Sequence, residues 1–133
     1  NIKKKIIKFK NTSSVKLLLK TLSNNNISLI LLAGFMKILP KEFIKNFKGK
    51  ILNIHPSLLP KYKGLNTHAR VIKNKEKYTG CTVHYVNFKL DSGKIIIQKR
   101  VKVSKQDNPK SLAKKVLKQE HRIYPKAILK LFN

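Results

Sequence analysis

The fold is decided by the stretch Ile27-Ser28-Leu29-Ile30-Leu31-Leu32-Ala33, in which apolar side chains occupy nearly every position. A short, nearly continuous apolar run is typical of a strand buried on both faces, as in a parallel sheet. Just before this run, apolar residues recur at helical spacing at Val15, Leu18, Leu19 and Leu22. A helix that leads into a buried strand indicates the α/β class.

The rest of the chain alternates between helical and strand patterns. Further helices are expected between Pro40 and Gly49, at residues 66–72 and from Asn108 onward. Further strands are expected at residues 51–54, 82–86 and 94–103. We therefore predict a single α/β domain over residues 1–133 with a mainly parallel sheet, in which the strands 27–33 and 51–54 are adjacent and parallel.

The charge of the chain is extreme, since 31 Lys and Arg residues stand against five Asp and Glu and give a formal net charge of +26. Such a surplus suits a polyanionic partner. Arg, whose planar fork grips phosphate and guanine, supplies only three of the basic residues. Lys, Asn and Ile share A/T-rich codons, so codon bias explains the charge without a selected partner, and we favour it. We expect nucleic acid to bind only non-specifically and in a salt-dependent manner.

The sequence predicts a soluble protein of the cytoplasm without a membrane partner. Its longest apolar stretch, residues 27–36, is interrupted by Ser28 and Gly34 and is too short to span a bilayer. The basic start of the chain continues into further lysines and does not have the pattern of a signal peptide. The one cysteine, Cys81, can form no disulfide within the chain and builds no metal site alone, so we expect no metal.

The segment with the most reactive side chains is Leu52-Asn53-Ile54-His55-Pro56, at the end of the second expected strand. Asn53 and His55 are two residues apart on a strand, so their side chains point to the same face. Ligands of open α/β sheets bind at the carboxyl ends of strands, where an amide can stabilise an oxyanion and an imidazole can move a proton. Judged by spacing alone, a simpler role is favoured, in which both side chains satisfy carbonyls of the turn.

Asp91 is one of only five acidic residues and lies in the expected turn Leu90-Asp91-Ser92-Gly93 between two apolar strands. An Asp that precedes Ser-Gly favours a tight turn by itself. A carboxylate in this position can also orient or charge a nearby imidazole. Both roles are open from these residues alone.

Together these segments resemble the glycinamide ribonucleotide formyltransferase family, folate-dependent enzymes of purine synthesis. The resemblance runs in order over nearly the whole chain, and the His-Pro-Ser-Leu-Leu-Pro block at residues 55–60 is its most specific part. The matching runs are residues 32–39, 52–62, 64–68, Val83-His84, Leu90-Asp91 and 119–125.

The resemblance implies a Rossmann-like formyltransferase fold that moves a formyl group from 10-formyltetrahydrofolate to the amine of glycinamide ribonucleotide. It places the catalytic roles on Asn53, His55 and Asp91. The amine would attack the formyl carbon directly, and Asn53 with protonated His55 would stabilise the oxyanion. Asp91 would favour the protonated imidazole by its charge and organise a water for proton transfer.

The resemblance also implies two binding regions. Backbone groups of a folate pocket would read the pterin edge, and this pocket consists of Met36, Lys37, Ile38, Leu39, Asn87, Phe88, Lys89 and Leu90. Glu120 and Pro56 would lie on the side of the ribonucleotide. Without the resemblance, residues 36–39 are typical of an ordinary strand end, and His84 either shapes the folate loop or packs in the core. The Leu59-Pro60 peptide bond is expected to be cis.

The sequence also departs from the family pattern. The family's first βαβ unit carries a Gly-Ser-Asn loop for the ribonucleotide phosphate, whereas glycine first occurs here at Gly34. A family Arg in the folate segment is Lys37 here, and a family Gln one turn before Glu120 is Leu117. We therefore expect the chain to lack the N-terminal part of the family domain, either as a truncated product or as half of a split enzyme with a separate N-terminal fragment.

Three other functions are compatible with parts of this pattern. Methionyl-tRNA formyltransferases share the catalytic Asn-x-His and Asp residues and the same cofactor, and a charge of +26 would suit a transfer RNA. A basic RNA-binding module is disfavoured, because the chain lacks an aromatic stacking platform accompanied by Arg. An inactive remnant would retain the same residues.

Overall fold

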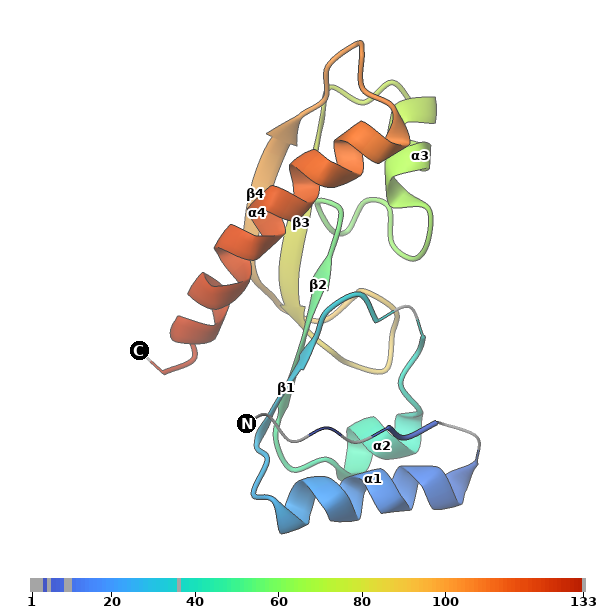
Figure 1. The fold of residues 1–133 in the computed structure, drawn as a ribbon, viewed down its shortest axis with the longest axis vertical. Helices are drawn as coiled ribbons and strands as arrows, with labels where there is room; N and C mark the ends of the chain where they lie inside the picture. The colour runs from blue at the N-terminus through green and yellow to red at the C-terminus, as the bar shows by residue number, and fades with distance from the viewer. Residues whose placement is uncertain (1–3, 5, 9–10, 36, 133) are drawn as a thin grey trace.

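The computed structural model describes residues 4, 6–8, 11–35 and 37–132, and Figure 1 shows its fold. The elements in chain order are α1 (Thr12–Asn24), β1 (Leu29–Leu32), α2 (Lys41–Asn46), β2 (Lys50–His55), α3 (Thr67–Lys73), β3 (Tyr78–Tyr85), β4 (Ile95–Lys102) and α4 (Pro109–Leu129). Every helix and strand expected from the sequence is present, so the α/β class is confirmed. Within the described part of the chain, no helix combines the length and apolar character needed to cross a membrane.

The strands of the described residues form one sheet in the order β1-β2-β3-β4. β1 and β2 are adjacent and parallel, as predicted. β2 pairs with β3, and β3 with β4, in the antiparallel direction, so the sheet is mixed and the prediction of a mainly parallel sheet is wrong. Parallel neighbours need a crossover, usually a helix, that returns the chain to the same end of the sheet. Residues 86–94 contain no helix, and β4 therefore returns antiparallel beside β3.

One face of the sheet packs against α4, which crosses β3 and β4 in Figure 1. Val116, Ile123 and Ala127 form a stripe along this helix, because their spacing returns each of them to the same side. The stripe belongs to a buried cluster that also contains Leu52, Cys81 and Val83 of the sheet. The Tyr124 hydroxyl donates a hydrogen bond of 2.8 Å to the Leu32 carbonyl and so ties α4 to the end of β1.

A second buried cluster joins α1 and α2 to the sheet. It contains Val15, Leu39, Phe43 and Ile51, with Leu18, Leu19 and Leu22 of α1 packed against it. The apolar face expected for this helix is therefore confirmed. The rings of Phe43 and Phe47 are stacked with their centroids 5.9 Å apart, which anchors the short α2. Figure 1 shows α1 and α2 side by side below β1 and β2.

The strand β1 is less buried than its apolar sequence indicates. Leu31 is 43% exposed, although its Cα partner on β2, Leu52, is completely buried. β1 is an edge strand, since β2 is its only neighbour among the described residues. The prediction of a strand was thus correct, while the prediction that it is buried was wrong. A strand with one neighbour leaves side chains and backbone groups of its other edge open.

The difference between Leu31 and Leu52 predicts unequal costs for the same substitution. Leu52→Ala should lower the free energy of unfolding by about 2–5 kcal/mol, because it opens a cavity in the cluster under α4. Leu31→Ala should cost less than about 1.5 kcal/mol, since the side chain already contacts solvent. Urea denaturation of both variants measures this. Equal losses would show that Leu31 is covered in solution.

Candidate functional site

Asn53 and His55 lie at the carboxyl end of β2, and their side chains share one face of the strand. Their Cα partners on the antiparallel strand β3 are His84 and Thr82 respectively. Asp91 lies in the loop between β3 and β4 and has a positive φ of 43°. That loop folds back over the end of β2, so the structure brings together all three residues that the sequence singled out.

Both ring nitrogens of His55 face acceptors. Nδ1 lies 3.3 Å from Oδ2 of Asp91, and Nε2 lies 2.8 Å from the carbonyl oxygen of Tyr62. The His55 and Asp91 side chains are both more than nine-tenths buried. Because a carbonyl can only accept, Nε2 must carry a hydrogen to bond with Tyr62. Nδ1 can donate to Asp91 at the same time only when it also carries a hydrogen.

The carboxylate of Asp91 also joins two loops. Its Oδ2 accepts a 2.9 Å hydrogen bond from the backbone N–H of Gly64, which belongs to the loop after β2. Gly64 has a φ of 77°, a left-handed conformation that glycine adopts without strain. The loop after β2 and the loop after β3 therefore meet at one carboxylate, beside His55.

A buried hydroxyl fixes the first residues of the loop after β2. Thr82 Oγ1 donates to the carbonyl of Ser57 at 2.7 Å and accepts from the backbone N–H of Leu59 at 3.1 Å. Gln98 of β4 donates to the same hydroxyl and to the Leu59 carbonyl, both at 2.9 Å. The Leu59-Pro60 peptide bond is cis, as predicted. This network orients the chain where it leaves His55.

His84 lies next to the trio and is almost fully buried. Its Nδ1 donates to the Tyr85 carbonyl at 2.8 Å, and its Nε2 lies 3.7 Å from Oδ1 of Asp91. Burial lowers the pKa of His84, although the Tyr85 carbonyl and Asp91 act in the opposite direction. The neutral ring is therefore favoured near pH 7. His84 is thus both packed in the interior and close to the loop that carries Asp91, so both roles left open for it stay open.

A cavity of about 790 Å³ opens above these residues. Asn53, His55 and Asp91 line it together with Pro56 and Glu120, the two residues expected on the ribonucleotide side. A volume of this size is typical of small-molecule sites. Among the described residues, no group of three or more His, Cys, Asp or Glu side chains is placed to hold a metal ion.

The residues expected in the folate pocket line a smaller cavity of about 60 Å³, which also contacts Asn53, His84 and Asp91. Its walls include Lys37, Ile38, Leu39, Asn87, Phe88, Lys89 and Leu90. Met36 lies outside the described residues. Ile38 is 72% exposed, so its side chain can contact a ligand. Leu39 is buried in the cluster with Phe43 and therefore packs mainly in the core.

The residues that line the larger cavity include three polar side chains to which the sequence analysis gave no role: His68, Lys110 and Lys114. Lys110 and Lys114 belong to α4, where they precede Leu117 and Glu120 at helical spacing. That spacing relative to Glu120 was a usable signal for them. His68 on α3 carried no such signal. Burial, and secondarily the charge of His55, lower the pKa of His68.

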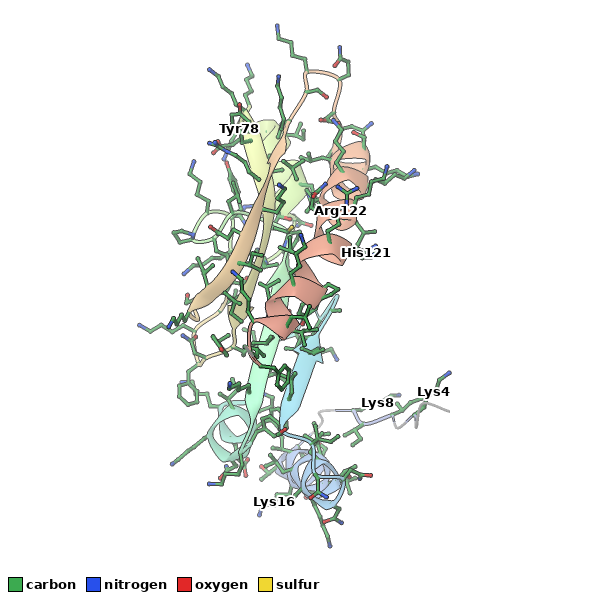
Figure 2. All side chains as sticks on the ribbon, turned by 90° about the vertical axis from the view of Figure 1, so that its left-hand side faces the viewer. Lys4, Lys8, Lys16, Tyr78, His121 and Arg122 are labelled. Atoms are coloured by element: carbon green, nitrogen blue, oxygen red, sulfur yellow. The ribbon has the colours of Figure 1, made fainter. Side chains whose placement is uncertain are left out.

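Basic side chains occur far from the site as well as beside it. Figure 2 shows Lys4, Lys8 and Lys16 at one end, near α1, and Arg122 on α4. The net charge of +26 therefore does not come from the site alone. Such a field attracts anions over long distances and weakens as salt is added.

Comparison with protein families gives one match over most of the chain. The family model described as formyl transferase matches residues 2–128. Among curated proteins, the chain is similar to phosphoribosylglycinamide formyltransferase of Haemophilus influenzae, with 48% identity over 102 residues, or 77% of this chain and 48% of that protein. It is also similar to the trifunctional purine biosynthetic protein adenosine-3 of Gallus gallus, with 47% identity over 82% of this chain and 11% of that protein.

Solved structures give the same picture. The phosphoribosylglycinamide formyltransferase of Anaplasma phagocytophilum superposes with a TM-score of 0.82 at 45% identity, covering 86% of this chain and 56% of that one. The enzyme of the same name from Streptococcus pneumoniae gives a TM-score of 0.86 at 29% identity, covering 95% and 71%. The Rossmann-like formyltransferase fold expected from the sequence is thus confirmed. The chain spans about half the length of the H. influenzae protein and of the A. phagocytophilum structure.

Two glutamates should respond in opposite ways to removal of their charge. Burial raises the pKa of Glu120 above its ordinary value of 4.5, so the charged form destabilises the fold once the pH exceeds that value. Hydrogen bonds from Tyr62 and Lys61 lower the pKa of Glu76, so its charge stabilises the fold at the same pH and ceases to do so in acid.

Glu120→Gln should therefore increase the free energy of unfolding at pH 7, and Glu76→Gln should decrease it. Both differences should shrink as the pH falls to about 4 or lower, where the carboxyls become protonated. Urea denaturation at several pH values measures both variants. A stability loss for Glu120→Gln at pH 7 would mean that Glu120 has a charged partner in solution.

Proposed function

Because the chain belongs to the formyl transferase family, whose model matches residues 2–128, we propose that it transfers a formyl group from 10-formyltetrahydrofolate to glycinamide ribonucleotide. The observation that carries this proposal is the meeting of Asn53, His55 and Asp91 at one ligand-sized cavity. The name of the H. influenzae relative supports the ribonucleotide, rather than a transfer RNA, as the acceptor.

In the proposed reaction the amine nitrogen attacks the formyl carbon and forms the new C–N bond, while the carbonyl electrons move to oxygen. The oxyanion would be stabilised by the Asn53 amide and the His55 imidazolium. The attacking nitrogen then loses one proton, N10 of the folate gains one, and the C–N10 bond breaks. His55 is the group placed to handle these protons, since it is the buried imidazole that lines the cavity beside Asp91.

The contact between His55 and Tyr62 bears on this role. Nε2 of His55 donates to the Tyr62 carbonyl at 2.8 Å, while Nδ1 faces Asp91. For Nε2 to reach the formyl oxygen, this hydrogen bond would have to be given up or shared. Tyr62 has a positive φ of 56° and lies in the loop after β2. Gly64 of the same loop donates its backbone N–H to Asp91. A small shift of that loop would free Nε2 without breaking the pair of His55 and Asp91.

The two cavities suggest how the ligands divide the site. The folate ring would enter beside Ile38 and the loop of residues 87–90, next to the smaller cavity. The ribonucleotide would lie along α4, where Lys110 and Lys114 could attract its phosphate and Glu120 its amine. The formyl carbon would then lie between the two, near Asn53 and His55.

A further polypeptide segment would complete the sheet at β1. β1 is an edge strand with a partly exposed Leu31, and the chain covers only 56% of the A. phagocytophilum structure. We propose that such a segment, upstream in the same polypeptide or on a separate N-terminal fragment, adds a strand to this edge. An added strand would pair with the backbone groups of β1 that β2 does not use.

His55→Ala should reduce formyl transfer by roughly 10²-fold, the usual scale for loss of a general acid–base group. His121→Ala is the matched control, because His121 is exposed on α4 and does not line either cavity of the site. Turnover of both variants is measured with saturating folate and ribonucleotide. Near-normal turnover of His55→Ala would reduce this histidine to a structural role.

The two ligands should differ in their response to salt. The ribonucleotide phosphate would meet Lys110 and Lys114, whose exposed point charges are screened by salt. Folate should bind more tightly than the ribonucleotide, and its affinity should change less, because its pocket is built from loop and strand residues. Calorimetry of each ligand at low and physiological salt measures this difference.

The replacement of Lys110 and Lys114 by Gln should weaken ribonucleotide binding, while Lys118→Gln on the same helix should not. Lys118 does not line the cavity. If the ribonucleotide bound tightly and its affinity did not change with salt concentration, another segment of the chain would have to bind the phosphate.

A further inference from the structure

Arg70 of α3 contacts the loop after β2 through both its donors and its face. Its Nη1 donates to the carbonyl of Lys63 at 2.6 Å and to that of Leu65 at 3.3 Å. Its guanidinium also lies over the ring of Tyr62, 5.2 Å from the centroid. A planar guanidinium can donate in its plane while its face covers a ring, which an ammonium group cannot do. Arg70 therefore holds three of the four residues from Tyr62 to Leu65.

The segment that Arg70 holds contacts both His55 and Asp91. The Tyr62 carbonyl accepts the 2.8 Å hydrogen bond from His55 Nε2. The backbone N–H of Gly64 donates to Oδ2 of Asp91 at 2.9 Å. These two residues flank the one whose carbonyl lies nearest to Arg70. A displacement of this short segment would therefore disturb the imidazole and the carboxylate together.

The same segment is joined to the loop after β3 by a side chain. Lys63 Nζ donates to Ser92 Oγ at 2.5 Å, and this hydroxyl donates in turn to a carbonyl of its own loop. Ser92 is the neighbour of Asp91, which receives the N–H of Gly64. A continuous series of contacts thus runs from α3 through the loop after β2 to the loop after β3, and Arg70 is its first member.

The backbone of the segment requires outside support. Tyr62 has a φ of 56°, and a bulky residue stays in this left-handed region only where surrounding contacts fix it. Its hydroxyl is bonded to Glu76 and Asn74, both at 2.9 Å, which fixes the far end of the side chain. Arg70 covers the ring and bonds the backbone on both sides of Gly64. The unfavourable conformation is therefore restrained at its side chain and just after it.

We propose that Arg70 is a positioning residue for the transfer reaction, which fixes residues 62–65 and thereby sets where the His55 imidazole and the Asp91 carboxylate lie in the cavity. Arg70 lines neither cavity of the site, so it acts through the loop. Groups of a reaction centre need such support, because small displacements of reacting atoms slow a reaction strongly. The effect on turnover rests on the proposed function, whereas the effect on the loop does not.

The hold on the loop is tested without turnover, by hydrogen exchange of the full chain followed by NMR. Arg70→Met keeps a side chain that can cover the Tyr62 ring and removes every donor. We expect the Gly64 amide to exchange about 10-fold faster in this variant, since its protection depends on the position of the loop. The Leu59 amide belongs to the same loop but donates to Thr82, so its exchange should stay unchanged. Unchanged exchange of Gly64, or equal acceleration of both amides, would overturn the proposal.

The effect on the reaction is tested by the turnover of three variants. Arg70→Met should lower kcat by about 10-fold, because the Gly64 hydrogen bond orients the carboxylate that faces the imidazole. The KM values should change little, since Arg70 lines neither cavity. Arg70→Lys keeps the charge but lacks the planar fork, so it should recover only part of the loss. Arg122→Met is the control, because Arg122 is exposed on α4 and also lines neither cavity.

A normal kcat of Arg70→Met, or an equal fall in Arg122→Met, would overturn the positioning role. Full recovery of kcat by Arg70→Lys would also overturn it, because the effect would then come from charge alone. Should the unmodified chain transfer no formyl group, the proposed function fails. The exchange of the Gly64 and Leu59 amides would in that case still decide whether Arg70 holds the loop.

Discussion

The contact between His55 Nδ1 and Asp91 Oδ2, 3.3 Å long and buried on both sides, is the interaction on which the site depends. It links the end of β2 to the loop after β3, and the same carboxylate oxygen receives the N–H of Gly64 from the loop after β2. A buried carboxylate without such partners would be costly to keep ionised. The two loops and the imidazole therefore stabilise one another, and the cavity above them has a defined wall.

The mixed sheet is what makes this contact possible. β2 runs parallel to β1 but antiparallel to β3. The last four residues of β2, residues 52–55, therefore pair in register with residues 85–82 of β3. Asn53 and His55 thus face His84 and Thr82 directly, and Thr82 in turn holds the start of the loop that follows His55. In an all-parallel sheet, a helical crossover would separate these strands and carry Asp91 to another place.

The surface of the molecule and its buried site differ in how charge is arranged. The surplus of lysine gives a net charge of +26, whereas inside the site the buried His55 and Asp91 contact each other. The positive field extends over the whole molecule and can draw anionic ligands towards it. Specificity has to come from the few buried polar atoms, because exposed charges are screened and have little geometric definition.

The sequence by itself determined the class of the fold, the positions of the helices and strands, and the pairing of Asn53 with His55 on one strand face. These features follow from local periodicity, and the His-Pro-Ser-Leu-Leu-Pro block specified the family. Only the tertiary structure decided that the sheet is mixed, that Leu31 lies on an open edge, and that Tyr62 and His84 surround the trio. Those facts depend on strand direction and on where loops return. Contacts between residues distant in sequence set both, and no local pattern records them.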